Sequence, residues 1–461
     1  MDAIDIAVEE GLPEALAELA QLVGVPSVAA RSDAPMQECA ERVAALFRAR
    51  GLEARLVAAG DGPPVVFAED RSAGVDAPTI LFYNHYDVQP AEPFELWHSD
   101  PWRMRMDNLT RTVYGRGVSD DKGHIICRLM ALDALRKLHG NQLPFNIKVV
   151  VEGEEEIGSV HLPQWVADHH NILAADVCVW EFGSVDDAGN PQIICGLRGI
   201  AYFELHCRTL RYDAHSGVGG SLFPNAAWRL VRALNTLKSV DERILLPGFY
   251  DSVHSATEAD LELLRNLPSE EEFLKREYGI ETFLNGATDV EYRRQQVFEP
   301  TCTICGIGSG YQGEGAKTVL PAKAMAKLDF RLVPDQDPDT VRDQLRAHLD
   351  AHGFDDIEIR YLCGSRPARV NPSHPYVRLA AQTARQVYQR EPAIVPLSGV
   401  SGPLHPFAAG LRQPVVTCGV GYPGSKVHAP NENLRLDDLL LGARHTAHFL
   451  YQASVQYPLA V

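Results

Sequence analysis

Residues 149–159 read Val-Val-Val-Glu-Gly-Glu-Glu-Glu-Ile-Gly-Ser and place four carboxylates within five positions. The three valines favour a strand that is buried on both faces. Carboxylates at the end of such a strand repel each other and lose hydration, so a cation is expected among them. The nearest Lys and Arg in the sequence are Lys148 and Arg198, and a divalent metal is therefore the working hypothesis. The alternative is a solvated acidic turn, which is the commoner structure for an isolated acidic run.

A second predicted strand, 79–84, runs directly into His85 and Asp87. Side chains two positions apart on a strand point to the same face. A carboxylate that fixes the tautomer of an imidazole is the usual arrangement around a metal-binding histidine. The alternative is a histidine that is simply hydrogen-bonded at the end of a strand.

Two more predicted strands lead into potential ligands. Strand 177–180 is followed by Glu181, and strand 414–419 leads into a Gly/Pro-rich loop that contains His428. In open α/β sheets, ligands bind outside the carboxyl ends of the strands. These side chains and the acidic run after strand 145–151 all follow the carboxyl ends of predicted strands. This common position predicts that they form one site.

A glycine-rich turn at 115–123 precedes a predicted amphipathic helix at 124–138. Asp120 and Asp121 come at the start of this helix, where the helix dipole favours negative charge. A phosphate-binding loop is an alternative, but the Gly-Lys-[Ser/Thr] ending of such loops is absent.

Composition narrows the class of protein. The chain has 461 residues, which suggests two or three domains, and its formal net charge is −18, which disfavours nucleic acid and anionic membrane as partners. We expect no membrane span and no secretory signal. The nine cysteines favour a reducing, cytoplasmic location, and Cys302 and Cys305 are interpreted as strand residues.

The pattern of predicted elements indicates one domain inserted into another. The first domain combines helical residues at 13–50 and 375–389 with the strands above and two short strands at 53–57 and 64–68. The middle of the chain predicts the order β-α-β-β-α-β of a ferredoxin-like sandwich, from elements at 200–207, 224–237, 301–306, 324–332, 338–352 and 356–362. We therefore expect an α/β domain with a mixed sheet, formed by 1–197 and 371–461, and an inserted α+β domain at 198–370. Residues 240–300 are acidic and partly helical, and their pattern does not place them.

Together the motifs resemble the M20 metallopeptidase family, in its cytosolic dipeptidase branch related to carnosine dipeptidases. Seven pieces in family order carry the resemblance, which covers nearly the whole chain: His85-Tyr-Asp87, Gly115-Arg-Gly-Val-Ser-Asp-Asp-Lys-Gly123, Glu152-Gly-Glu-Glu-Glu-Ile-Gly-Ser159, Asp213-Ala-His-Ser-Gly217, Lys317-Thr-Val-Leu-Pro321, Phe330-Arg-Leu-Val-Pro334 and Val427-His-Ala-Pro-Asn-Glu432. The fold it implies is a zinc-exopeptidase-like catalytic domain with an inserted lid and dimerisation domain.

The resemblance also implies a set of ligands for two metal ions. Asp120 is expected to bridge the metals, and Asp87 to orient a ligating imidazole. The other expected ligands, two histidines and two glutamates, are His85, Glu156, Glu181 and His428. Zinc is the expected metal, with manganese and cobalt as alternatives. Dipeptidase relatives often carry Asp at the position of Glu181, whereas carboxypeptidase and deacylase relatives carry Glu.

By the same resemblance, Glu155 is the general base that takes a proton from a water activated by two metals and passes it to the leaving amine. This alignment leaves Glu154 without a direct role. A shift of one position would make Glu154 the base and Glu155 the ligand.

The inserted domain is expected to supply substrate contacts. His215 resembles the family's oxyanion histidine, which acts in the active site of the partner subunit of a homodimer. Arg331 is expected to bind the α-carboxylate of a small peptide substrate. Thr318 and Ser401 are further expected contacts, while a turn histidine and a surface ion pair are the alternatives for His215 and Arg331.

The resulting hypothesis is metal-dependent hydrolysis of dipeptides or short peptides by a cytoplasmic homodimer. An N-acyl-amino-acid deacylase of the same family is the first alternative. A non-catalytic metal-binding or interaction protein is an alternative of another class, and a nucleotide-binding enzyme is disfavoured by the missing phosphate loop.

Overall fold

The structure is a computed structural model that describes residues 2–457. Its contacts divide the chain into two units. Unit 1 comprises residues up to 196 together with 369–396 and 403 onwards, and unit 2 comprises 197–368 and 397–402. No helix among residues 2–457 is long and apolar enough to cross a membrane.

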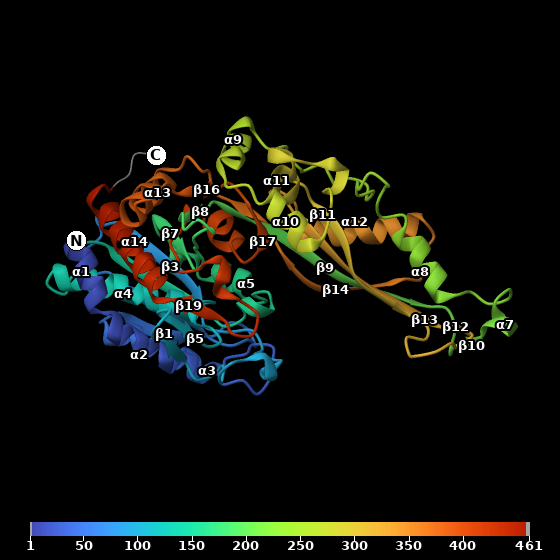
Figure 1. Cartoon of the computed structure of the whole chain (residues 1–461), viewed down its shortest axis with the longest axis horizontal. Helices are drawn as coiled ribbons and strands as arrows, with labels where there is room; N and C mark the ends of the chain where they lie inside the picture. The colour runs from blue at the N-terminus through green and yellow to red at the C-terminus, as the bar shows by residue number, and fades with distance from the viewer. Residues whose placement is uncertain (1, 458–461) are drawn as a thin grey trace. The chain divides into compact units, whose positions relative to one another are not determined.

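Unit 1 is built on a mixed six-stranded sheet (Figure 1). In spatial order its strands are β1 (Glu53–Val57), β2 (Val65–Asp70), β6 (Asn146–Glu152), β3 (Thr79–His85), β7 (Val177–Trp180) and β18 (Val415–Thr417). The last four run parallel, and β1 and β2 complete the sheet in antiparallel pairs. The residues of β6 are all buried, as the run of valines predicts for a central strand.

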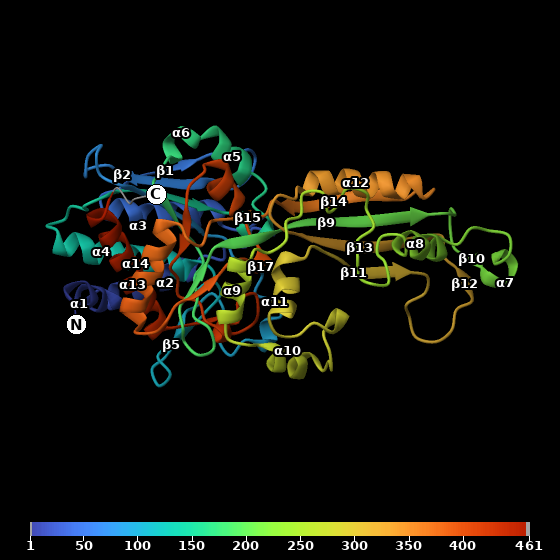
Figure 2. The ribbon, with the colours of Figure 1, turned by 90° about the horizontal axis from the view of Figure 1, so that it is seen from above.

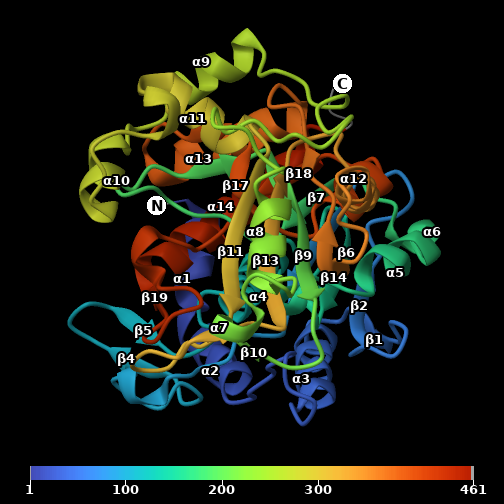
Figure 3. The same cartoon turned by 90° about the vertical axis from the view of Figure 1, so that its right-hand side faces the viewer.

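Helices cover both faces of this sheet. Figures 2 and 3 show its strands between α5 and α6 on one side and α1 to α4 on the other. The helices of unit 1 are α1 (Ala3–Glu10), α2 (Leu12–Val23), α3 (Met36–Ala49), α4 (Lys122–Leu138), α5 (Leu162–Asp168), α6 (His170–Leu173), α13 (Pro375–Tyr388) and α14 (Leu436–Val455). Two small sheets complete the unit: β4 (Arg105–Asp107), β5 (Thr112–Tyr114) and β19 (Asn433–Arg435) form one, and β8 (Gln192–Ile194) and β16 (Ala393–Val395) form the other.

Unit 2 is built on a six-stranded sheet with an antiparallel path in the order β11-β13-β9-β14. The strands of this path are β9 (Gly196–Arg208), β11 (Thr301–Ser309), β13 (Lys323–Leu332) and β14 (Glu358–Ser365). The short strands β15 (Ala368–Arg369) and β17 (Ser398–Ser401) also pair with β9. Helices α8 (Ala226–Leu234) and α12 (Pro338–Ala351) cover one face, and their apolar residues form a single core with alternate residues of β9 and β13. This is the expected ferredoxin-like arrangement, and the predicted fold class is confirmed.

Two local predictions differ from the structure, and one stretch that the sequence left unplaced is now assigned. Residues 13–50 are not continuously helical, because α2 ends at Val23 before Gly24 and Pro26, and α3 begins only after Pro35. The unplaced stretch 240–300 forms α9 (Glu258–Asn266), α10 (Glu271–Tyr278) and α11 (Asp289–Phe298). Residues 397–402, expected in the first domain, group with unit 2 because β17 (Ser398–Ser401) pairs in parallel with β9 and Leu397 packs on Leu264 and Val297.

Candidate metal centre

The expected ligands of unit 1 converge at the carboxyl ends of three neighbouring parallel strands. His85 is the last residue of β3, Glu156 lies in the short 3₁₀ turn Glu155–Ile157 after β6, and Glu181 follows β7 directly. Parallel strands end at the same edge of a sheet, so the register alone brings these side chains together.

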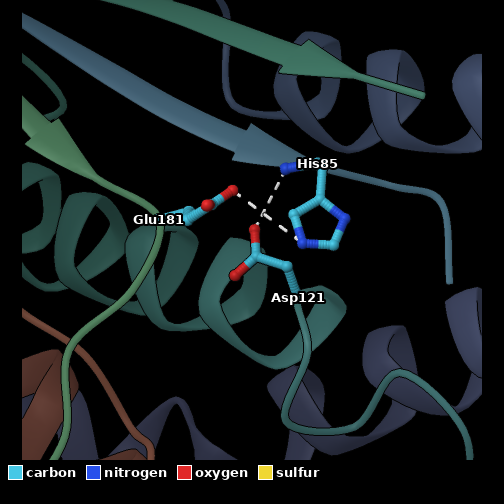
Figure 4. Close-up of side chains that lie close together, drawn as sticks. All are labelled: His85, Asp121 and Glu181. Atoms are coloured by element: carbon cyan, nitrogen blue, oxygen red, sulfur yellow. Dashed lines mark hydrogen bonds and ion pairs between the residues drawn. The ribbon is translucent and has the colours of Figure 1, made fainter. Parts of the chain in front are cut away.

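The first group of potential ligands contains His85, Asp120 and Glu181. His85 Nε2 lies 3.1 Å from Asp120 Oδ1 and 3.8 Å from Glu181 Oε2. Figure 4 shows the imidazole of His85 and the carboxylate of Glu181 pointing toward each other from adjacent strand ends.

The second group contains Asp120, Glu156 and His428. His428 Nε2 lies 3.0 Å from Asp120 Oδ2 and 3.1 Å from Glu156 Oε2. Asp120 therefore presents one carboxylate oxygen to each group, which is the geometry of a residue shared by two cations.

The sequence did not predict the role of Asp121 in the site. Its carboxylate lies close to His85 and Glu181 (Figure 4), and the three side chains form a possible cation site. However, Oδ2 accepts hydrogen bonds from Asn84 Nδ2 at 2.7 Å and from the backbone N–H of His85 at 3.0 Å. Oδ1 lies 3.0 Å from His124 Nδ1. Because Oδ2 already has two protein donors and Oδ1 faces the imidazole of His124, we interpret Asp121 as a clamp on the end of β3.

Asp87 fastens two parts of the site. His85 Nδ1 lies 3.1 Å from the backbone oxygen of Asp87 and 3.3 Å from its Oδ1, on the side of the imidazole opposite Asp120. The same carboxylate accepts the backbone N–H groups of Glu155 and Glu156 at 3.3 and 3.0 Å. Asp87 is fully buried, so it holds both the imidazole and the acidic turn in fixed positions.

The acids of the 152–156 run have different partners. Glu154 is bound by the backbone N–H of His161 and by its ring, at 3.1 and 2.8 Å. Glu152 accepts hydrogen bonds from Tyr83 Oη at 2.6 Å and Ser159 Oγ at 2.8 Å. Burial raises the pKa of Glu152 to about 8. Glu156 belongs to the second group, and its Oε2 also accepts a hydrogen bond from Gln89 Nε2 at 2.9 Å.

Burial, together with the neighbouring carboxylates, perturbs the charges of the site. Burial raises the pKa of Glu155 and of Glu181 well above the usual range, and nearby acids raise both further. Burial opposes ionisation of Asp120, but hydrogen bonds with His428 and His85 hold its pKa well below the usual range. Hydrogen bonds to Asp120 and Glu156 raise the pKa of His428 to about 10. The clustered carboxylates of the site are therefore stabilised by a positive charge placed among them.

In unit 2 the structure brings together two pairs of predicted residues. His215 lies on a two-residue strand opposite Val319, with its Nε2 3.4 Å from Thr318 Oγ1. Its Nδ1 accepts the N–H of Gly217 at 3.1 Å. On β13, Arg331 donates from Nη1 to Ser401 Oγ at 3.0 Å and from Nε to Asp329 at 3.1 Å.

With this geometry established, the chain can be compared with known proteins. The model of peptidase family M20/M25/M40 matches residues 81–452. This chain belongs to that family. Among the M20 relatives, the Beta-Ala-His dipeptidase of Mus musculus is 28% identical over 403 residues, covering 86% of this chain and 81% of the relative. The Cys-Gly metallodipeptidase dug1 of Schizosaccharomyces pombe is 27% identical and is matched over 99% of both chains.

Solved structures of M20 proteins give the same assignment. The M20 family metallo-carboxypeptidase Sso-CP2 from Sulfolobus solfataricus is 36% identical, with a TM-score of 0.88 over 95% of this chain and 98% of that one. Human carnosine dipeptidase 1 is 26% identical, with a TM-score of 0.78 over 98% and 99%. The predicted family is therefore confirmed, and the protein is a metallopeptidase whose relatives support metal-dependent dipeptide hydrolysis.

The residues of this M20 site fit divalent cations. Glu181 Oε2 is buried and has no hydrogen-bond partner among the described residues, as expected for an atom that binds a cation. Imidazole nitrogens with carboxylate oxygens are the donor set of zinc, and manganese and cobalt accept the same ligands. The candidate cluster thus agrees with the metal dependence of the family.

Proposed function

We propose that this protein hydrolyses dipeptides or short peptides that carry a free α-carboxylate, with two divalent cations in the centre described above. His85, Asp120 and Glu181 would hold one cation, and Asp120, Glu156 and His428 would hold the other. The observation that carries this proposal is the division of the Asp120 carboxylate, with one oxygen toward each histidine.

The bound cations, zinc first and manganese or cobalt as alternatives, would supply Lewis acidity that polarises the scissile carbonyl and lowers the pKa of water. Glu155 would act as general base and then as general acid. Its backbone N–H is anchored on Asp87. Its carboxylate would accept a proton from the attacking water and deliver it to the nitrogen of the leaving amine.

The hydrogen bonds of His215 support a role as donor to the oxyanion. Because Nδ1 accepts the N–H of Gly217, the ring proton lies on Nε2. An Nε2–H group can donate to an oxygen that becomes negatively charged during attack. We propose that it does so in the site of a second subunit. The exposed Ile304 and Ile307 on β11, an edge strand of its sheet, and Trp228 on α8 provide apolar surface that a homodimer could cover.

Arg331 would bind the substrate carboxylate. Its guanidinium is partly exposed, and Ser401 and Asp329 fix its orientation. A planar guanidinium can bind a carboxylate through two parallel hydrogen bonds. Thr318 would support His215 in the same way that Ser401 supports Arg331. Inserted residues 198–370 together with 397–402 would thus form the lid and dimerisation domain, and the rest of 1–197 and 371–461 the catalytic domain.

Two related activities remain as alternatives. Glu181 is typical of carboxypeptidase and deacylase relatives, and the metallo-carboxypeptidase from Sulfolobus solfataricus is 36% identical to this chain. Removal of the C-terminal residue of longer peptides is therefore the second candidate, and deacylation of N-acyl amino acids the third. All nine cysteines are free, which supports the reducing cytoplasm as the location.

A substrate panel with a matched variant tests the proposal. Purified protein loaded with Zn²⁺, Mn²⁺ or Co²⁺ is assayed on dipeptides, longer peptides and N-acetyl amino acids. We expect the highest kcat/KM on dipeptides and loss of activity with a chelator. Glu155→Gln should lower kcat by about 10²- to 10⁴-fold without loss of bound metal, whereas Glu154→Gln should lower it far less. Deacylation without peptide hydrolysis would overturn the dipeptidase assignment, and full activity of Glu155→Gln would remove Glu155 from the mechanism.

A further inference from the structure

The glycine-rich loop 115–120 closes around a carboxylate from the other end of the chain. Glu432 is fully buried. Its Oε1 accepts the backbone N–H groups of Ser119 at 2.9 Å and Asp120 at 3.0 Å. Its Oε2 accepts the N–H of Gly117 at 2.9 Å and Nη1 of Arg116 at 2.7 Å.

This loop has the properties of an anion-binding nest. Backbone N–H groups that converge before a helix bind phosphate in other proteins. Gly117 has φ +86°, and a Cβ at this position would lie 2.8 Å from Val88 Cγ1, so the curvature requires glycine. Here the anion is the carboxylate of Glu432, and Arg116 neutralises it. The resemblance of this loop to a phosphate cradle therefore has an internal explanation.

Glu432 joins the two segments that form the second ligand group. Asp120, which is shared between both groups, donates its own N–H to Glu432. His428 lies four residues before Glu432 in the same loop. The Glu432 carboxylate therefore contacts the backbone of Asp120 and belongs to the same loop as His428.

The carboxylate is not needed to keep these two segments adjacent. The N–H of Gly115 donates to the backbone oxygen of Glu432 at 3.1 Å. The β19 and β5 strands pair immediately beyond, with Asn433 opposite Tyr114. The Glu432 side chain additionally orients the backbone N–H groups of residues 117–120. This orientation sets the direction in which the Asp120 side chain leaves the backbone.

From these contacts we propose that Glu432 is a positioning residue that fixes Asp120 relative to His428 and so sets the spacing of the two cations. This inference rests on the proposed two-cation function. Residues that orient metal ligands change metal affinity or activity by about 10- to 100-fold when they are replaced. Glu432 should belong to this class although it touches neither cation.

The test variant is Glu432→Gln, which keeps the shape of the side chain but replaces one acceptor oxygen by an NH₂ group. Calorimetric titration of the metal-free protein with Zn²⁺ should give Kd values about 10- to 100-fold weaker than those of wild type. The visible absorption spectrum of the Co²⁺-loaded protein should change, and kcat should fall while KM for a dipeptide stays the same. A purely structural role would lower thermal stability but leave the spectrum of the fully loaded protein unchanged.

Two further variants complete the experiment. Asp70→Asn removes a carboxylate that pairs with Arg136 at the opposite end of the sheet, and it should leave Zn²⁺ affinity unchanged. Arg116→Met with Glu432→Gln removes both buried charges and keeps the test valid if the single variant does not fold, because the N–H groups of 117–120 still lack the carboxylate. Wild-type affinity and spectrum in a folded Glu432 variant would overturn the inference alone. A wild-type protein that binds no Zn²⁺ would overturn the proposed function together with it.

Discussion

The two groups of proposed functional residues differ in how firmly the fold holds them. In unit 1, His85 and Asp87 are buried, and several hydrogen bonds from different elements hold each one. In unit 2, His215 and Thr318 are exposed. His215 lies on a ladder of only two residue pairs, and Thr318 directly precedes the partner strand. Hydrogen bonds within one chain thus hold the unit 1 residues in place, whereas we propose that the unit 2 residues become fixed through contacts with substrate or a second subunit.

The largest effect is expected in the buried group. Asp120→Asn removes the charge that we propose both cations share, so kcat/KM should fall by about 10³-fold or more, equivalent to roughly 4 kcal/mol. Elemental analysis should show loss of bound metal. Asp437→Asn, at an exposed carboxylate paired with Arg111, should retain full activity and metal content. If the Asp120 variant binds as much metal as wild type does, the distinction between the buried residues of unit 1 and the exposed residues of unit 2 is lost.

The next effect concerns the exposed group. His215→Ala should lower kcat by about 10²- to 10³-fold through loss of an oxyanion donor, without change in bound metal. Mixing this variant with Glu155→Gln under conditions of subunit exchange should restore roughly one quarter of the wild-type activity, because half of the dimers then contain one complete site. Absence of recovery in verified mixed dimers would place His215 in the site of its own subunit.

A smaller effect is expected at Arg331. Arg331→Lys keeps the charge but loses the planar pair of donors, so KM for a dipeptide should rise by about 10- to 100-fold with little change in kcat. Dipeptide amides, which lack the carboxylate, should be poor substrates of wild type and unaffected by the substitution. If the variant discriminates between the two substrates as well as wild type does, another residue binds the carboxylate.

The smallest effect is a pH dependence of stability in the metal-free protein. The pKa of His428 is raised to about 10, whereas a histidine in an unfolded chain titrates near 6.5. The stability contributed by its protonated form is complete below about pH 6.5 and is lost as the pH rises through about 10. Because the side chain is half exposed, solvent weakens the effect, and we expect Tm to fall by roughly 2 °C between pH 7 and pH 9.5.

The metal-loaded protein should lack this decrease, because a ligating histidine is neutral at every pH at which it binds metal. His428→Gln in the metal-free state is the matched control. A slope in this variant as steep as in wild type would assign the pH dependence to other groups, such as Glu152.

Residue patterns were sufficient to predict much of the fold. The valines before Glu152 predicted the central strand, and apolar spacing predicted α4 to within two residues of its start at Lys122. The ferredoxin-like order followed from six elements, of which β9, β13, α8 and α12 bury one face against a common core. The helical prediction for residues 13–50 was wrong where Gly24, Pro26 and Pro35 interrupt the chain, since local breakers outweigh a weak apolar pattern.

The partners of individual acids could not be predicted in this way. Glu154, Glu155 and Glu156 are identical in type and adjacent in sequence, yet only Glu154 pairs with His161. Asp121 was expected to be an ordinary acid at the start of a helix, but it clamps the backbone of His85. Such contacts depend on the direction of each side chain and on segments far apart in the sequence.

The sequence by itself determined which residue types follow the strands, and therefore the chemistry that this edge of the sheet can perform. Periodicity and strand ends are local properties, and the chain carries them without reference to distant segments. Only the tertiary structure decided which acid faces which partner: that Asp120 turns one oxygen to His85 and the other to His428, and that Glu432 fills the glycine-rich loop. The contacts of Asp120 with His428 and of Glu432 with the loop join residues about 300 positions apart. Burial makes the second of these obligatory, because the buried charge of Glu432 without partners would be too costly to keep.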